Sequence, residues 1–334
     1  MISLTRRARS RAVAALLVAP SAALIVASPQ ALAQAWPERT VRLVVPFPSG
    51  GATDLVGRVI AQRLSKDLGQ QVVVENKAGA GGTLGSAEAA KAAPDGYTLL
   101  LATSSTHSVA PQLMPKLPYD AGRDFTPIAH VADAASVLLV TPSLPAKSVA
   151  ELIAVAKARP GQLNYASSGN GTIVHLTTEA FKTQAGVFMT HIPYKGTAQS
   201  IPDIVAGNVH LIFDSIPSGM PHVKSGRLRA LAVTGPKRSE LAPELPTVAE
   251  SGLPGFSSVT WFGLFGPRGM SADTVARVHD AFVKVLATPE VVAGLAKLGA
   301  EPAAPSSPAR FAAMVAEDGQ RWGRLIRERK ITAE

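Results

Sequence analysis

A glycine-rich turn early in the chain has the composition of an anion-binding loop. The turn reads Pro-Phe-Pro-Ser-Gly-Gly-Ala-Thr-Asp over 46–54 and follows the apolar run 41–45. Apolar residues then recur at helical spacing from Leu55 to Leu64, so a strand, a tight turn and a helix are expected in succession. Thr53 and Asp54 are candidate N-caps. We predict that Gly50 and Gly51 expose bare backbone N–H groups which, with the helix dipole, attract a carboxylate or a phosphate.

Motifs for catalysis, nucleotides or metals are weak. The phosphate loop ending in Gly-Lys-Ser/Thr, the His-Glu-x-x-His motif and the Gly-x-Ser-x-Gly elbow are all absent. The run 79–85 is rich in glycine but lacks dinucleotide-binding spacing, and the next strand ends in Thr103-Ser104, not in an acid. His175 and Glu179 share a helix face without a third ligand in reach, which favours an ordinary helix pair. We therefore expect no cofactor and no metal.

Composition excludes further classes. The 334-residue chain carries 33 basic and 24 acidic residues, a formal charge of +9, and 5% aromatic residues. Its basic residues are scattered except near 321–330, whereas a nucleic-acid binder needs a basic stripe with interleaved aromatics. The absence of cysteine excludes disulfides and thiol catalysis. The length suffices for two lobes or for one large α/β domain.

The N-terminus is typical of an export signal. Four arginines precede the apolar run 12–27, and Ala31-Leu32-Ala33 fits a cleavage site, as does Ala33-Gln34-Ala35. We predict a signal peptide over 1–33, with cleavage after Ala33 or Ala35. Its removal takes away four Arg and no acid, which leaves 33 − 4 − 24 = +5. An N-terminal membrane anchor is the alternative. Later segments lack about 18 uninterrupted apolar residues, so a soluble, exported product is expected.

Predicted strands and helices alternate along the mature chain, which is typical of parallel α/β units. Two units of three to four strands fit two lobes better than one sheet. The passages 128–140 and 257–266 are the expected crossings between lobes. Strands are predicted at 41–45, 71–75, 97–103, 136–140, 163–166, 187–192, 209–213, 228–233 and 259–265, and helices at 54–68, 84–92, 148–158, 173–184, 197–206, 273–287 and 308–329.

Polar loops follow several of these strands. They are 46–54, 104–107, 167–172, 194–197 and 214–215. In open α/β sheets, ligands bind outside the carboxyl ends of the strands. The loops offer small hydroxyls, glycines and a single cation, Lys195, which suits hydrogen bonding to a small anion.

Several segments together resemble one family. They are 44–54, 73–82, 93–99 (Ala-Pro-Asp-Gly-Tyr-Thr-Leu), 117–120, 124–128 and 228–233. They are similar to the substrate-binding proteins of tripartite tricarboxylate transporters, the Bug-type periplasmic receptors, over nearly all of the mature chain. Family members often have Pro-Pro-Gly-Gly in the first loop, where this chain has Pro48-Ser49 before its glycines.

The resemblance implies an α/β fold of the two-lobed periplasmic-binding-protein type (type II, Venus flytrap) with a ligand cleft between the lobes. We expect 36–131 and 259–334 in one lobe and 132–258 in the other. It implies a monomeric, non-enzymatic receptor that captures a small organic acid in the periplasm for integral-membrane transporter subunits. Backbone amides and water would hold the carboxylate. By position, the implied ligand-binding residues are Phe47, Pro48, Gly50, Gly51, Thr53, Asp54, Ser104 and Thr106 from one lobe and Ser168, Gly171, Thr172, His175, Tyr194, Lys195, Gly196, Thr197 and Asp214 from the other.

Two other functions stay open at this point. One is a secreted α/β enzyme acting on a small carboxylate, with His175, Asp214 or Lys195 as acid or base. The other is a ligand receptor for a sensor kinase. Which acid binds is also open: dicarboxylates, tricarboxylates, aromatic acids, acidic amino acids and amides all fit the loops.

Overall fold

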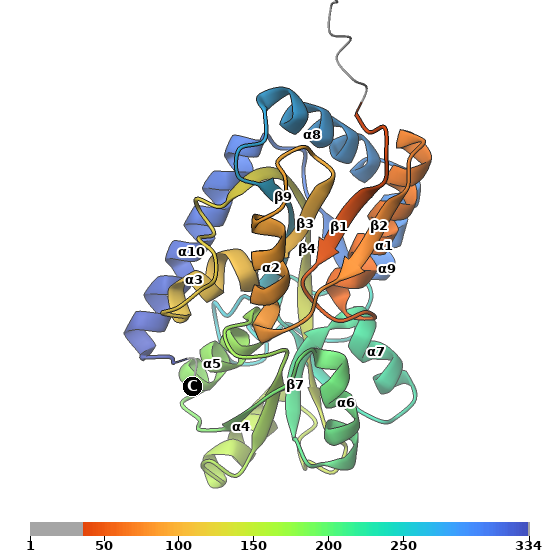
Figure 1. Ribbon diagram of the computed structural model, residues 1–334. Coiled ribbons are helices and arrows are strands. Elements are labelled where there is room, and N and C mark those ends of the chain that lie inside the picture. Colours follow the sequence, from red (N-terminus) through yellow and green to blue (C-terminus); the bar gives the residue numbers. More distant parts are fainter. Residues whose placement is uncertain (1–35, 333–334) are drawn as a thin grey trace, which may run out of the picture. The chain divides into compact units, whose positions relative to one another are not determined.

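The computed structural model describes residues 36–332, so the predicted signal peptide and its cleavage positions lie outside the described residues. Figure 1 shows two lobes, each a sheet with helices packed on it. The strands are β1 (Val41–Val45), β2 (Val72–Asn76), β3 (Thr98–Thr103), β4 (Phe125–Val140), β5 (Asn164–Ser167), β6 (Thr190–Pro193), β7 (Leu211–Ser215), β8 (Arg229–Val233), β9 (Val259–Pro267) and β10 (Ala300–Pro302). The helices are α1 (Ala52–Leu68), α2 (Thr83–Ala90), α3 (Ala110–Leu113), α4 (Val149–Ala158), α5 (Ile173–Ala185), α6 (Thr197–Ala206), α7 (Ile216–Lys224), α8 (Ala272–Leu286), α9 (Pro289–Lys297) and α10 (Pro308–Arg329), with short turns η1 (Ala80–Gly82) and η2 (Ser105–Val109).

The first lobe contains a mixed sheet. Its strand order is β2-β1-β3-β9-β4, with β10 added along β4. The three strands β1, β2 and β3 are parallel, whereas β9 runs antiparallel to both β3 and β4. The carboxyl ends of β1 and β3 therefore lie at the same edge of the sheet.

The second lobe is built on the other half of β4. Phe125 to Ala135 pair with β9, whereas Ser136 to Val140 pair with β7 and β8. Next to β7 lies β5, and next to β5 lies β6, all three parallel. One strand thus continues from one sheet into the other, so the two sheets are joined and not separate.

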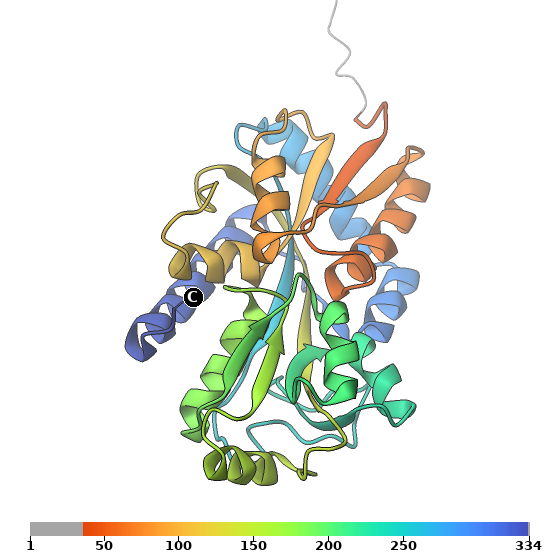
Figure 2. The same cartoon turned by 60° about the horizontal axis from the view of Figure 1, so that its bottom comes forward.

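Burial alternates along the strands as a two-sided sheet requires. In β1, Leu43 packs in a core with α1, α8 and α9, whereas its neighbour Val44 packs against α2 and Phe311 of α10. Successive side chains of a strand point to opposite faces, so each face of this sheet carries its own helical layer. Figure 2 shows the helices on both sides of the strands. This layering fixes where the strand ends, and the loops after them, are held.

Most predicted elements are present, and the errors have local causes. No helix was predicted at 216–224 or at 289–297, yet both segments are helices (α7 and α9). Pro217 and Pro289 occupy the first turn of their helices, where the missing N–H costs nothing. The predicted N-caps Thr53 and Asp54 are wrong: the N-cap is Gly51.

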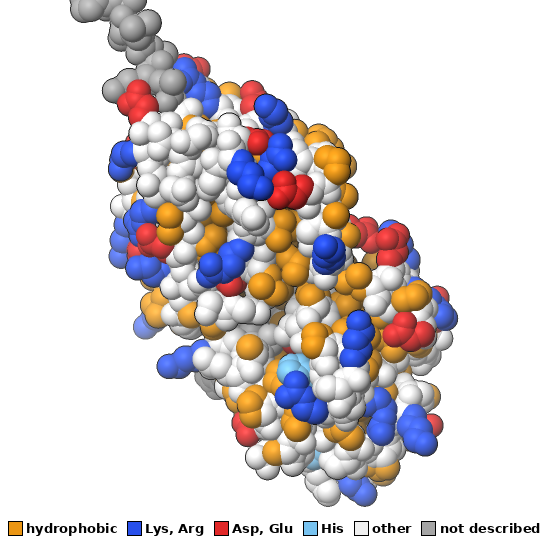
Figure 3. All heavy atoms as spheres, turned by 90° about the vertical axis from the view of Figure 1, so that its right-hand side faces the viewer, with side chains coloured by type: hydrophobic (Ala, Val, Ile, Leu, Met, Phe, Trp, Pro, Cys, Tyr) orange, Lys and Arg blue, Asp and Glu red, His pale blue; other side chains and the backbone are white. Residues whose placement is uncertain are grey.

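One face of the molecule carries charged side chains of both signs. Figure 3 shows them interspersed over that face. Within residues 36–332, no helix combines the length and apolar character needed to cross a bilayer.

Candidate functional site

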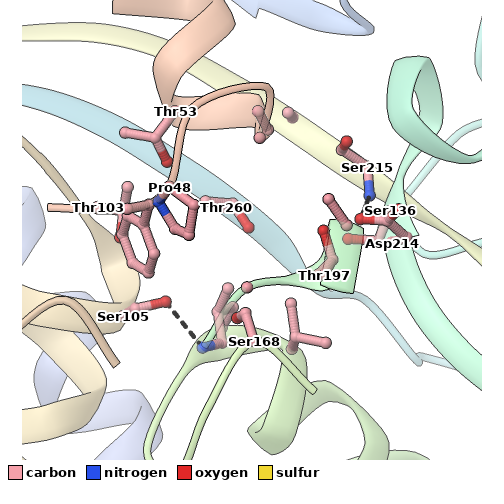
Figure 4. A pocket seen from close by; sticks show the side chains of 18 of the residues that line it. Pro48, Thr53, Thr103, Ser105, Ser136, Ser168, Thr197, Asp214, Ser215 and Thr260 are labelled. Carbon is pink, nitrogen blue, oxygen red and sulfur yellow. Dashed lines mark hydrogen bonds between the residues drawn. The ribbon is translucent and has the colours of Figure 1, made fainter. Parts of the chain in front are cut away.

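A cavity of about 90 Å³ lies where the two sheets meet. This is several times the space that one water molecule needs. Figure 4 shows its polar side chains, which come from the carboxyl ends of strands in both lobes and from the two long strands that pass behind. The wall consists of 47–49 and 51–53 after β1, Thr103 and Ser105 after β3, 134–136 of β4, Ser168, Ile173 and Val174 after β5, 196–199 after β6, Asp214 and Ser215 of β7, and Thr260 and Phe262 of β9.

The wall is poor in charge. Its one ionisable side chain is Asp214, and neither Lys, Arg nor His contributes to it among the described residues. An anion bound there would therefore be neutralised by dipoles and hydrogen bonds, not by a formal cation.

Three helices begin at the wall without a side-chain cap. The N-caps are Gly51 for α1, Gly196 for α6 and Ser215 for α7, and none of them caps its helix through its side chain. The first N–H groups of a helix have no partner inside it, and their end of the helix carries a partial positive charge. The cavity is thus surrounded by backbone donors suited to an anion.

The start of α5 differs, because Thr172 accepts a hydrogen bond from the N–H of His175. The N–H of Ile173, the first residue of α5, donates to Oγ of Ser105 at 2.9 Å. This bond joins the second lobe to the first, and Figure 4 shows it between the Ser105 side chain and the loop near Ser168. The lobes therefore touch directly beside the cavity.

Three buried polar atoms of the wall lack a hydrogen bond within the described chain. They are Oγ1 of Thr103, Oδ2 of Asp214 and Oγ of Ser215. Leaving a buried polar group without a partner costs about 1–3 kcal/mol, so such groups are normally paired in the functional state. They are the atoms to which a ligand or ordered water would bind.

Asp214 shapes the electrostatics of the wall. Its side chain is buried, and Oδ1 accepts the N–H of Ser215 at 2.8 Å. Burial raises the pKa of this carboxyl above its ordinary value, while nearby hydroxyls of Ser218 and Thr197 oppose part of that rise. Burial raises the pKa of a carboxyl because it disfavours the charged form.

The structure brings eight of the predicted site residues to the cavity wall. They are Phe47, Pro48, Gly51, Thr53, Ser168, Gly196, Thr197 and Asp214. Gly196 and Pro48 belong to different lobes yet lie so close that a Cβ on Gly196 would meet the proline ring at 2.9 Å.

The other predicted residues of the first lobe do not reach the wall. Asp54 is 2% exposed and accepts the N–H of Gly50 at 2.9 Å while pairing with Arg58. The prediction that the Gly50 and Gly51 amides are bare is therefore wrong. The Gly50 N–H donates to Asp54, and the Gly51 N–H donates to the Pro48 carbonyl at 3.4 Å. Ser104 and Thr106 are buried behind Thr103 and Ser105, and Thr106 Oγ1 donates to the Thr103 carbonyl.

The remaining predicted residues of the second lobe also lie outside the cavity. Gly171 packs on Met114 and Thr172 caps α5. The buried ring of His175 stacks on His191 with centroids 4.1 Å apart. Tyr194 and Lys195 line a neighbouring groove that shares Gln199 with the cavity.

Sequence reasoning missed the contribution of the crossing strands. Ala134, Ala135 and Ser136 of β4 and Thr260 and Phe262 of β9 form part of the wall. The expected lobe crossings at 128–140 and 257–266 could have indicated them, since strands that pass between lobes must pass the cleft. Ser105 and Ser215 lay in loops that were singled out, one residue from the predicted positions. Within residues 36–332, no cluster of three or more His, Cys, Asp or Glu could hold a metal ion.

Comparisons with known proteins agree with this architecture. The chain is similar to protein BugT of Bordetella pertussis, with 39% identity over 297 residues that cover 89% of this chain and 91% of that protein. Rpa4515 of R. palustris, solved with adipate, is 39% identical with a TM-score of 0.86 over 89% of this chain and 99% of that one. MatC (Rpa3494) of Rhodopseudomonas palustris, solved with bound malate, is 36% identical with a TM-score of 0.82 over 87% and 99%.

A family model extends the match over nearly the whole of the described chain. The model for the tripartite tricarboxylate transporter family receptor, TctC, matches residues 56–331. Relatives more than 30% identical match this chain along most of their length, and the solved ones share its fold. The chain belongs to the tripartite tricarboxylate transporter receptor family.

Proposed function

We propose that this receptor captures a small organic acid in the cavity between its lobes and delivers it to membrane subunits of a tripartite tricarboxylate-type transporter. The observation that carries the proposal is the convergence of three uncapped helix N-termini on a cavity without a cation. Such ends bind carboxylates through backbone N–H groups. The similar proteins solved with adipate and malate hold carboxylates, which supports the same ligand class here.

We propose that the eight predicted residues at the wall contact the ligand, together with Thr103, Ser105, Ser215 and Thr260. The carboxylate would bind at the start of α1, near Gly51 and Thr53. Asp54, Ser104, Thr106, Gly171, Thr172 and His175 would support these loops from behind. Tyr194 and Lys195 would act from the neighbouring groove, at longer range.

The lobes would divide as expected from the sequence, with 36–131 and 259–334 in one and 132–258 in the other. The partner exchange of β4 between Ala135 and Ser136 supports a boundary close to this point. The crossings would act as hinges for closure over the ligand.

The family supports a proposal for location and assembly. Cleavage after Ala33 or Ala35 would release a monomer into the periplasm. Mass spectrometry of the exported protein tests this, and retention of Arg6 to Arg11 would contradict it.

We propose binding without turnover. Of the three residues that the enzyme alternative names as acid or base, Asp214 lies on the cavity wall, whereas His175 and Lys195 lie outside it. The sensor-kinase alternative uses the same ligand site and differs only in the membrane partner.

A thermal-shift screen of small mono-, di- and tricarboxylates tests the ligand class, with the matched amides and alcohols as controls. At 100 times its Kd a ligand adds about 2.7 kcal/mol to stability, which gives a clear shift. We expect shifts with carboxylates and none with the matched alcohols. NMR of each hit after prolonged incubation should show the acid unchanged. Consumption of the acid, or hits confined to uncharged compounds, would overturn the proposal.

A further inference from the structure

Ser105 joins the two lobes at the edge of the cavity. It begins η2, shortly after β3 of the first lobe, and its Oγ accepts the N–H of Ile173 at the start of α5 in the second lobe. Figure 4 shows this bond beside the cavity. Ser105 is 3% exposed and Ile173 is 4% exposed, so the bond is shielded from water. A hydrogen bond in such surroundings is electrostatically stronger than one in water.

An apolar cluster surrounds this bond and bridges the lobes. It consists of Val109, Leu113, Ile173, Leu176, Trp322 and Ile326. Two of these residues belong to α5 of the second lobe, whereas the others belong to η2, α3 and α10 of the first. Movement of the lobes apart at this cluster would break the hydrogen bond, since its donor and its acceptor lie on different lobes.

The hydroxyl of Ser105 keeps its proton available to the cavity. A serine hydroxyl has one proton to donate and two lone pairs that accept. The bond from Ile173 uses one lone pair, and the proton has no acceptor within residues 36–332. Ser105 lies on the cavity wall together with Thr103, whose buried Oγ1 has no partner in the described chain. Both hydroxyls can therefore donate to a ligand.

A carboxylate is the acceptor that suits this hydroxyl best. Hydrogen bonds to charged oxygens are shorter and roughly twice as strong as bonds between neutral groups. When a hydroxyl donates to an anion, its oxygen becomes a better acceptor, because hydrogen bonds in a chain polarise one another. A carboxylate bound to Ser105 would thus strengthen the bond from Ile173. The positive end of α5 would act on the anion through the same hydroxyl.

We infer that Ser105 couples recognition of the ligand carboxylate to closure of the lobes: it donates its proton to the carboxylate and accepts the first N–H of α5 from the opposite lobe. This role of Ser105 rests on the proposed carboxylate site at the start of α1. Figure 4 shows Thr53 of α1 on the same side of the cavity as Thr103 and Ser105, so one carboxylate can contact both loops. The group that binds the anion is then also the group that holds the lobes together.

Amide hydrogen exchange, followed by NMR, tests the coupling on the unmodified protein. The probes are succinate, adipate, malate and citrate, each at a saturating concentration where it binds. We expect the N–H of Ile173 to exchange at least tenfold more slowly with a bound acid than without one. The N–H of Glu151 is the internal control, because it also donates to a serine Oγ, that of Ser148, but within one lobe. Exchange at Ile173 that slows no more than exchange at Glu151 would overturn the inference.

Ser105→Ala tests the assigned hydroxyl, with Ser108→Ala as the matched control. Ser108 lies in the same turn and is fully buried, but its hydroxyl donates to the Val315 carbonyl within the first lobe. In titration calorimetry, Ser105→Ala should bind the acid at least tenfold more weakly than Ser108→Ala. In solution scattering, saturating acid should contract Ser108→Ala and the unmodified protein more than Ser105→Ala. A serine that only supports the fold would leave this contraction unchanged, so equal contraction or equal affinity in the two variants would contradict the inference.

Folding and function are checked separately. Circular dichroism and thermal unfolding establish that Ser105→Ala is folded, and the exchange measurement on the unmodified protein tests the coupling even if it is not. If neither the four acids nor the wider carboxylate screen shows binding, the proposed function itself fails, and the role of Ser105 with it. If an acid binds while exchange at Ile173 does not respond, the role of Ser105 alone fails.

Discussion

Gly50 and Gly51 are adjacent glycines with different roles. Gly50 has φ of +81°, a backbone conformation that favours glycine, and its N–H is held by Asp54. Gly51 has an ordinary φ of −79° and lies on the cavity wall as the N-cap of α1. The first glycine therefore serves the turn, whereas the second keeps the wall free of a side chain.

This difference predicts opposite effects of substitution. Gly51→Leu should fold, because its Cβ would meet only the Pro48 carbonyl oxygen, at 3.5 Å. It should nevertheless abolish ligand binding, because the rest of the leucine side chain would occupy the cavity. Gly50→Ala should cost about 1–2 kcal/mol of unfolding free energy from its positive φ, yet leave binding nearly unchanged. Calorimetry and urea denaturation of both variants measure this. Native affinity in Gly51→Leu would contradict the proposed site.

Lys195 tests how the anion is neutralised. It lies in the groove beside the cavity and not on the wall, so it acts through solvent at most. Lys195→Met should weaken binding tenfold or less, since exposed ion pairs contribute about 0.2–1 kcal/mol and 1.4 kcal/mol is tenfold. The salt dependence of the on-rate should flatten more than the off-rate changes. A thousandfold loss in a folded variant would point to a direct ion pair and against recognition by backbone amides.

At the scale of elements, local patterns predicted what is local. Strand 41–45 and helices 197–206 and 308–329 match the structure because their periodicity and flanking turns lie within the segment itself. The first half of β4 was not predicted, since Pro127 interrupts the pattern; the structure accommodates it at an irregularity in the register with β9. The site was predicted only in part because the pairing of β4 with β9, and the depth of each loop residue, depend on tertiary packing.

Helix caps offer a prediction for elements. Thr172→Ala removes the cap of α5, whose first turn lies at the cavity and bonds to Ser105 of the other lobe. Ser148→Ala removes the corresponding cap of α4, whose residues do not contribute to the cavity. Each should lower the unfolding free energy by about 1 kcal/mol. Only Thr172→Ala should also weaken ligand binding, which titration calorimetry would measure. Equal ligand affinities for the two variants would mean that the start of α5 does not contribute to the binding site.

For the whole molecule, buried histidines predict sensitivity to acid. Burial lowers the pKa of His175 to about 4 and of His191 to about 3, and the N–H of Gly171 donates to Nδ1 of the neutral His175 ring. The unfolded chain takes up these protons first, near pH 6.5, so the unfolding free energy should fall as pH drops from about 6.5 to about 4. Each pKa unit corresponds to about 1.4 kcal/mol, which makes the loss roughly 3 kcal/mol for His175 alone.

Urea denaturation between pH 7.5 and 4.5 measures this loss. The raised pKa of Asp214 acts in the opposite sense over this range, because the folded state then holds its proton more tightly. His191→Asn removes one of the buried histidines and should flatten the curve. An unchanged slope in that variant would assign the acid sensitivity to other groups.

Closure of the two lobes also has a specific contact that can be tested. Gly81 of the first lobe faces the loop after β5, and a Cβ on Gly81 would lie 2.8 Å from the carbonyl oxygen of Asn170. A Cβ on Gly169 of that loop would likewise lie 3.4 Å from the backbone of Gly81. The lobes can thus meet at this point only because neither residue has a side chain there.

Gly81→Val should therefore hold the lobes apart. The control position is Gly69 at the end of α1. Its φ of +64° is close to the +66° of Gly81, but a Cβ added to Gly69 meets nothing within 4 Å. Gly69→Val thus carries the same backbone strain without the steric block. A ligand that binds the closed form loses apparent affinity in proportion to the closed fraction, so Gly81→Val should bind at least tenfold more weakly than Gly69→Val. In solution scattering, saturating ligand should contract Gly69→Val and the unmodified protein more than Gly81→Val. Equal contraction in both variants would mean that closure does not pass through the contact of Gly81 with Asn170.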